Sequence, residues 1–171
     1  MTDRSDDTGD KVAHELLVAR ALIVALRAAG EDIDDPRPRG APDAVVSSPR
    51  GPIGIEVADA FYDDTGPPAA PAWGTPVPAG LAEGGSDAAL AEHLNATLRD
   101  QCRKSYGMPT YFVLDVGAAP PSGAADGPAM AAALTIPEGC RFARIFLRMT
   151  PRAGGAPAVF EVPRPRVGGA T

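Results

Sequence analysis

The sequence predicts an α/β fold in a single domain, and three observations lead to that prediction. Two stretches repeat apolar residues at helical spacing, and several shorter runs have the alternating or continuous apolar pattern of strands. A chain of 171 residues is also long enough to bury a core of its own. We expect the domain to cover residues 10–150, between a disordered N-terminus at 1–9 and a mostly irregular tail at 151–171.

The first half of the domain is expected to hold one helix and two main strands. The helix is expected at 10–29, with Asp10 as its N-cap and Gly30 at its end. A short edge strand is expected around Ile33. Two longer strands are expected at 43–48 and 53–61, and the sequence SPRGP between them is typical of a tight connection.

The second half begins with a long insertion. Residues 62–85 are rich in proline and glycine and have no period, so we expect a loop. A helix is expected over 86–106, where leucines recur at helical spacing and Lys104 falls on a neighbouring polar stripe. Strands are expected at 110–116, buried on both faces, and at 141–149. The sequence AVFEV in the tail is a further candidate edge strand.

The net charge of −6 excludes nonspecific coating of nucleic acid. A polyanion would need a local basic surface, and the C-terminal part is the one sizeable basic region. The alternative is that its arginines only solvate a strand and the tail. The candidate surface consists of Arg141, Arg144, Arg148 and Arg152.

The cysteines and the apolar runs point to the cytoplasm. Cys102 and Cys140 are far apart and lack zinc-site spacing, so we expect reduced thiols. No apolar run approaches the roughly 20 residues that span a bilayer, and the acidic first residues do not resemble a signal peptide. We therefore expect no membrane partner. His14 and His93 have no partner at metal-ligand spacing and are expected at the surface.

Two carboxylates interrupt the apolar strands. Asp43 begins the first strand, and Glu56 lies in the middle of the second, on the same face as Gly54 and Ala58. A short antiparallel connection would bring both acids together, with space beside them. Oxygen ligands of this kind suit Mg²⁺ or Mn²⁺, which can polarise a phosphoryl oxygen and activate a water.

Each carboxylate also has a simpler interpretation. Asp43 could be a turn acid at the edge of a strand. Glu56 could lie on a solvated sheet face or pair with an arginine such as Arg37 or Arg50. Glu15, at the edge of the first helix's apolar stripe, could reach past the core to water.

The sequence resembles the PD-(D/E)XK superfamily, which has the restriction-endonuclease-like fold. The resemblance rests on a helix with Glu15, the pair Pro42-Asp43 at a strand start, the stretch IGIEVA, then a helix and a buried strand. It implies a core in the order αβββαβ, a mixed sheet flanked by helices. It also implies that Asp43 and Glu56 hold the metal together with the carbonyl of Val57, and that Glu15 supports the site.

The sequence departs from the superfamily's motif at its lysine. Two residues after Glu56, where the motif has lysine, this chain has Ala58. In some branches the lysine moves to the following helix, and Lys104 is the candidate there, although lysines are also common near helix C-termini because the dipole favours them. The resemblance therefore implies metal-dependent phosphodiester hydrolysis on DNA or RNA, with Asp43, Glu56, Lys104 and Glu15 as catalytic residues.

Two other functions remain open. The chain could be a catalytically inactive member of the same fold that acts as a binding or interaction module. It could also be a small protein whose proline-rich loop, which contains Trp73, docks a partner.

Overall fold

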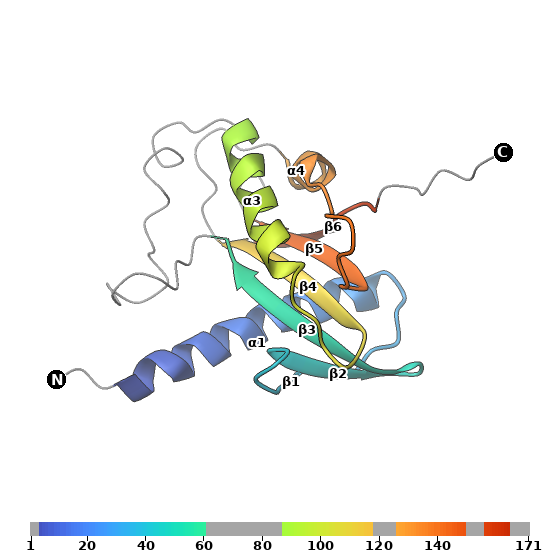
Figure 1. Cartoon of the computed structure of the whole chain (residues 1–171). Helices are drawn as coiled ribbons and strands as arrows, with labels where there is room; N and C mark the ends of the chain where they lie inside the picture. The colour runs from blue at the N-terminus through green and yellow to red at the C-terminus, as the bar shows by residue number, and fades with distance from the viewer. Residues whose placement is uncertain (1–3, 61–86, 118–125, 150–155, 165–171) are drawn as a thin grey trace.

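The computed structural model describes residues 4–60, 87–117, 126–149 and 156–164 (Figure 1). The expected loop at 62–85 lies outside these residues, as do Trp73 and Arg152. The described residues form three helices and six strands. In chain order these are α1 (Arg4–Ala28), β1 (Arg37–Pro38), β2 (Ala44–Ser48), β3 (Gly51–Asp59), α3 (Asp87–Gln101), β4 (Thr110–Gly117), α4 (Gly127–Ala133), β5 (Arg144–Met149) and β6 (Ala158–Glu161).

All six strands belong to one mixed sheet in the order β1-β2-β3-β4-β5-β6. Strand β2 is antiparallel to its neighbours β1 and β3, strands β3, β4 and β5 are parallel, and β6 is antiparallel to β5. The expected tight connection joins β2 to β3, where Ser48 pairs with Gly51. Gly51 has a φ of 113°, a conformation that favours glycine. The predicted α/β class is confirmed.

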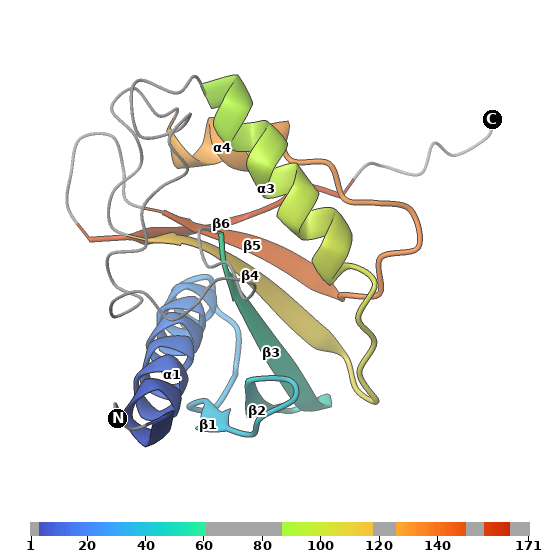
Figure 2. The ribbon, with the colours of Figure 1, turned by 60° about the vertical axis from the view of Figure 1, so that its left-hand side comes forward.

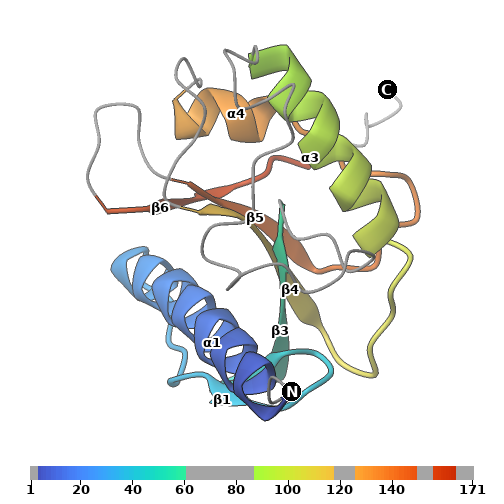
Figure 3. The same cartoon turned by 90° about the vertical axis from the view of Figure 1, so that its left-hand side faces the viewer.

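The sheet is the middle of three layers. Helix α1 covers one face, and α3 and α4 cover the other (Figures 2 and 3). Under α1 the core includes Leu22, Ile55 and Val113, and under α3 it includes Leu94 and Phe112. Strand β4 is therefore buried on both faces, as its continuous apolar run predicts.

The structure corrects several element bounds. Helix α1 begins at Arg4, so Asp10 lies inside it and is not its N-cap. Ile33 is not in a strand but is buried under α1. Helix α3 ends at Gln101 and does not reach Lys104. Helix α4 was not expected, although Asp126 caps it by accepting a hydrogen bond from the backbone N–H of Ala129.

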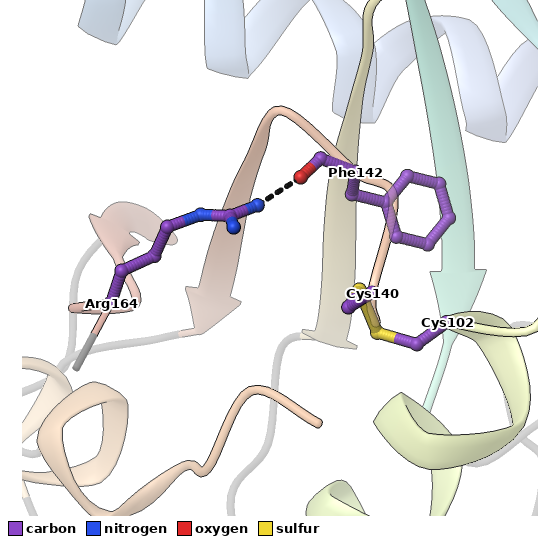
Figure 4. The surroundings of a disulfide bond; sticks show 4 residues. All are labelled: Cys102, Cys140, Phe142 and Arg164. Atoms are coloured by element: carbon purple, nitrogen blue, oxygen red, sulfur yellow. Dashed lines mark hydrogen bonds between the residues drawn. A yellow bond between two sulfur atoms is a disulfide. The ribbon is translucent and has the colours of Figure 1, made fainter. Parts of the chain in front are cut away.

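The prediction of reduced thiols is wrong. Cys102, just after α3, and Cys140, before β5, form a disulfide with their Cα atoms 4.7 Å apart (Figure 4). The sequence separation of 38 residues hides this contact. The two cysteines meet because β4 and α4 return the chain to the end of α3.

Candidate functional site

Asp43 immediately precedes β2, which lies between β1 and β3 in the sheet. Ala44 pairs with Ile55 across the antiparallel strands, so Asp43 runs beside Glu56 and Val57 of β3. The backbone N–H of Val57 donates a 2.8 Å hydrogen bond to Oδ2 of Asp43. A strand residue directs its N–H and its carbonyl to the same edge, so the Val57 carbonyl also faces this side. The carboxylate of Asp43 is thus fixed beside the middle of β3.

Gly54 allows the turn before β2 to pack this closely. A Cβ atom at Gly54 would lie 2.5 Å from Cγ of Pro42 and 2.9 Å from Oγ1 of Thr110. Only glycine therefore lets Pro42 lie against β3, and Pro42 leads directly into Asp43. The sequence suggested that Gly54 leaves open space beside Glu56. Instead, Pro42 fills the space next to Gly54.

Glu56 is nearly buried, with 5% of its surface exposed. The ammonium group of Lys104 donates a 2.6 Å hydrogen bond to Oε1 of Glu56. A buried carboxylate needs such a partner, because desolvation of an unpaired charge is strongly unfavourable. The cation that meets Glu56 is therefore Lys104, and not Arg37 or Arg50.

Lys104 reaches Glu56 from a turn and not from a helix. The backbone N–H of Lys104 donates to the carbonyl of Gln101, the last residue of α3, at 2.9 Å. The expectation that Lys104 lies on a polar stripe of the helix is therefore wrong. The turn nevertheless directs the Lys104 side chain to Glu56, and 46% of that side chain remains exposed.

Tyr106 is a further residue of the site, and it is not among the candidate site residues predicted from the sequence. Its hydroxyl is hydrogen-bonded to Glu56, and burial together with this bond and the charge of Glu56 raises the pKa of Tyr106. The phenol therefore stays protonated and can donate to the carboxylate. In the sequence, Tyr106 and Gln101 resemble the glutamine-tyrosine helix of some nucleases only faintly, because their spacing differs by one residue, and Tyr106 lies in a stretch without regular structure.

Glu15 approaches the two carboxylates from α1. Burial raises the pKa of Glu15, the nearby Lys11 lowers it, and the charge of Glu56 raises it. The ammonium of Lys11 lies 3.7 Å from Oε1 of Glu15. Glu15 therefore does not simply reach into water, because it is close enough to Glu56 for their charges to interact.

Asp43 has an unusual protonation equilibrium. The pKa of Asp43 is raised to about 7: burial raises it most, the hydrogen bond from Val57 lowers it, and the charges of Glu56 and Glu15 raise it. Like charges that are crowded in this way favour binding of a proton or another cation. The charges of Glu15, Asp43 and Glu56 thus influence one another's protonation.

The carboxylate oxygens of Asp43 and Glu56 are ligands of the kind that a hard divalent cation binds. Val57 contacts Oδ2 of Asp43, and both Lys104 and the Tyr106 hydroxyl contact Glu56. A carboxylate has about four lone-pair sites, so each group could still ligate a cation. Among the described residues no group of three or more His, Cys, Asp and Glu is arranged as a metal cage. Mg²⁺ needs no such cage, because it binds through one or two carboxylates and keeps several waters.

The predicted basic surface is wrong for two of its arginines. Arg148 is 8% exposed and its guanidinium lies 2.8 Å from Oδ1 of Asp115. Arg144 pairs with Glu31 and Glu161. Helix α1 covers this face of β5, which the alternation of residues along the strand could not reveal. Arg141 is exposed, as expected.

The histidines are also more enclosed than expected. Nε2 of His14, on α1, lies 3.0 Å from Oδ2 of the buried Asp115, which also holds Arg148. His14, Asp115 and Arg148 therefore connect α1, β4 and β5. The His93 ring is half-buried, and its Nε2 contacts the carbonyl of Ala60.

No protein-family model, curated protein or solved structure matches this chain. None of the helices in the part of the chain that the structure describes has the length and apolar character needed to cross a membrane. The function must therefore be inferred from the site itself.

Proposed function

We propose that this protein hydrolyses phosphodiester bonds of DNA or RNA with a bound Mg²⁺ or Mn²⁺ ion. The observation that carries this proposal is the contact of Lys104 with Glu56, beside Asp43. Together these residues offer oxygen ligands for a cation and a positive group next to them. Metal-dependent cleavage of a phosphodiester needs both.

The order of elements supports the same proposal. Helix α1, the antiparallel strands β1, β2 and β3, helix α3 and the parallel strand β4 follow one another as αβββαβ. This is the order of the restriction-endonuclease-like core. We therefore propose that the chain is a member of the PD-(D/E)XK superfamily whose motif lysine is replaced by Ala58.

Each residue of the site would have a distinct role. Asp43, Glu56 and the carbonyl of Val57 would hold the metal ion, which when bound polarises a phosphoryl oxygen and lowers the pKa of a water. Lys104 would stabilise the negative charge that develops at phosphorus. It contacts Glu56 now, and its half-exposed side chain leaves it accessible to substrate. Glu15 would support the site through its charge.

A binding module without catalysis is the second candidate. It is favoured by Ala58, and by the ability of Lys104 to neutralise Glu56 without any metal. In this case the ion pair would stabilise the fold, and the surface around it would bind a partner. The two functions predict different effects of Mg²⁺ on the melting temperature and on the cleavage of nucleic acid.

The first experiment measures the melting temperature with and without millimolar Mg²⁺ or Mn²⁺. A ligand that binds only the folded state raises the melting temperature by mass action. We expect an increase in the wild type and none in Glu56→Gln, which removes a charged ligand and keeps the shape. Exposed Glu92→Gln is the matched control and should respond like the wild type. No increase in the wild type would refute the metal site.

The second experiment measures cleavage of end-labelled single- and double-stranded DNA and RNA by the same three proteins. We expect metal-dependent products with the wild type and the control, and none with Glu56→Gln. Metal binding without cleavage of any of these substrates would reject the nuclease and favour the binding module.

A further inference from the structure

A cavity of about 230 Å³ adjoins the site at Lys104. Lys104 and Arg141 contribute positive charge, and Ser105 and Tyr106 contribute hydroxyl groups. Lys104 and Tyr106 line the cavity and also contact Glu56, so the cavity lies directly beside the candidate metal site.

Arg141 differs from the neighbouring arginines in its partners. Arg144 and Arg148 both pair with carboxylates. Among the described residues no carboxylate forms an ion pair with Arg141, whose guanidinium donates a 3.2 Å hydrogen bond to Oγ of Ser105. An arginine presents several donors in one plane, so most of this guanidinium is available to an anion.

A disulfide links the segment that carries Lys104 to the segment that carries Arg141. The disulfide joins Cys102, two residues before Lys104, to Cys140, the residue before Arg141. On the other side, the guanidinium of Arg164 donates to the carbonyl of Phe142 (Figure 4). The backbone that carries Arg141 is therefore held from both sides. A site whose donors are held in place before binding loses less entropy when its ligand arrives.

We infer that this cavity binds a backbone phosphate of the nucleic acid, next to the phosphate that is cleaved. The inference rests on the proposed function. The Arg141 guanidinium, the half-exposed Lys104 ammonium that also pairs with Glu56, and the adjacent hydroxyl groups match the charge and the acceptor oxygens of a phosphate. A chain of net charge −6 needs such a local positive site to hold a polyanion. The cavity lies beside Lys104, so its phosphate would position the strand for cleavage.

The first test titrates metal-free protein with inorganic phosphate and follows the backbone amide NMR signals. We expect saturable shifts at residues 104–110 and 140–142. Arg141→Ala should bind phosphate about tenfold more weakly, since one charge-assisted contact is lost. The matched control is Arg103→Ala, because Arg103 is next to Lys104 in sequence and its side chain is 82% exposed. Equal weakening by both variants, or the absence of saturable shifts, would overturn the inference.

The second test separates a backbone phosphate from a free phosphate. Binding of a single-stranded oligonucleotide without terminal phosphates is measured over a range of salt, without divalent metal. Removal of one phosphate contact should reduce the slope of log K against log salt by about 0.7 in Arg141→Ala and leave it unchanged in Arg103→Ala. An unchanged slope in Arg141→Ala would assign the cavity to free phosphate and refute the inference.

These tests are independent of the nuclease proposal, because neither needs metal or cleavage. If phosphate and oligonucleotide bind as expected but no substrate is cleaved, the proposed activity fails and the phosphate site stands. If cleavage occurs but Arg141→Ala binds like the wild type, the activity stands and the phosphate site fails.

Discussion

The ammonium nitrogen of Lys104 lies 2.6 Å from Oε1 of Glu56, although 48 residues separate them in sequence. Glu56 is nearly buried in a central part of the sheet, whereas Lys104 is half-exposed after α3. The pair thus lies at the boundary between core and solvent. A cation in this position is protected on one side and accessible to a ligand on the other.

Replacement of Lys104 tests its role in cleavage. Lys104→Ala should lower kcat for metal-dependent cleavage by about 10²- to 10³-fold, because the group that stabilises developing charge is lost. With Mg²⁺ present, its melting temperature should stay close to that of the wild type, since a metal ion bound in the proposed site would compensate the charge of Glu56. Single-turnover kinetics measure the effect, and Arg103→Ala serves as control. A Lys104→Ala variant with more than half of wild-type activity would contradict this role.

Asp43 should make stability depend on pH. The pKa of Asp43 is about 7 in the folded protein, compared with an ordinary value of 3.8, so the folded state holds this proton more tightly than the unfolded chain. The stabilising contribution of Asp43 is therefore complete below about pH 4 and is lost as the pH rises to about 7. Urea unfolding of metal-free protein between pH 4 and 8 measures this loss.

The variant Asp43→Asn isolates that contribution. Asparagine cannot titrate, so the fall in the free energy of unfolding over this pH range should become smaller. Glu15, whose pKa is also raised, contributes a loss of the same sign that remains in the variant. If the wild type and Asp43→Asn have parallel stability curves over this pH range, Asp43 does not have a raised pKa.

The buried pair of Asp115 and Arg148 should be important for stability. Asp115→Ala leaves the Arg148 guanidinium buried without its carboxylate, and such a change lowers the free energy of unfolding by about 3–5 kcal/mol. The double variant Asp115→Leu with Arg148→Met should recover most of this loss, since no buried charge remains. Urea unfolding measures both, with exposed Glu138→Ala as control. A loss below 1 kcal/mol in Asp115→Ala would show that solvent reaches Arg148.

The periodicity of apolar residues predicts most of the elements but not what covers them. Arg144 and Arg148 share a face of β5 in the sequence pattern, as they do in the structure. Whether that face is exposed depends on α1, which is distant in sequence and lies over it. A single strand therefore cannot show whether its arginines bind nucleic acid or a buried aspartate.

The candidate site could be predicted in part, for a physical reason. Asp43 and Glu56 are joined by a short hairpin, so their proximity follows from strand alternation and one tight turn. The approach of Lys104 depends instead on where α3 ends. Its last turn leads to Cys102, whose partner Cys140 is far along the chain. Long-range contacts of this kind leave no local pattern.

Because Cys102 and Cys140 form a disulfide, the redox conditions of an assay determine whether the oxidised or the reduced form of the protein is measured. Nuclease buffers often contain dithiothreitol, which converts such a bond into two thiols. The turn with Lys104 and the segment with Arg141 would then lose their covalent link, while Asp43 and Glu56 would stay on the sheet. Under the proposed function, a reductant would therefore leave the metal ligands in place and weaken the binding of nucleic acid. Activity measured only in a reducing buffer would describe this loosened form.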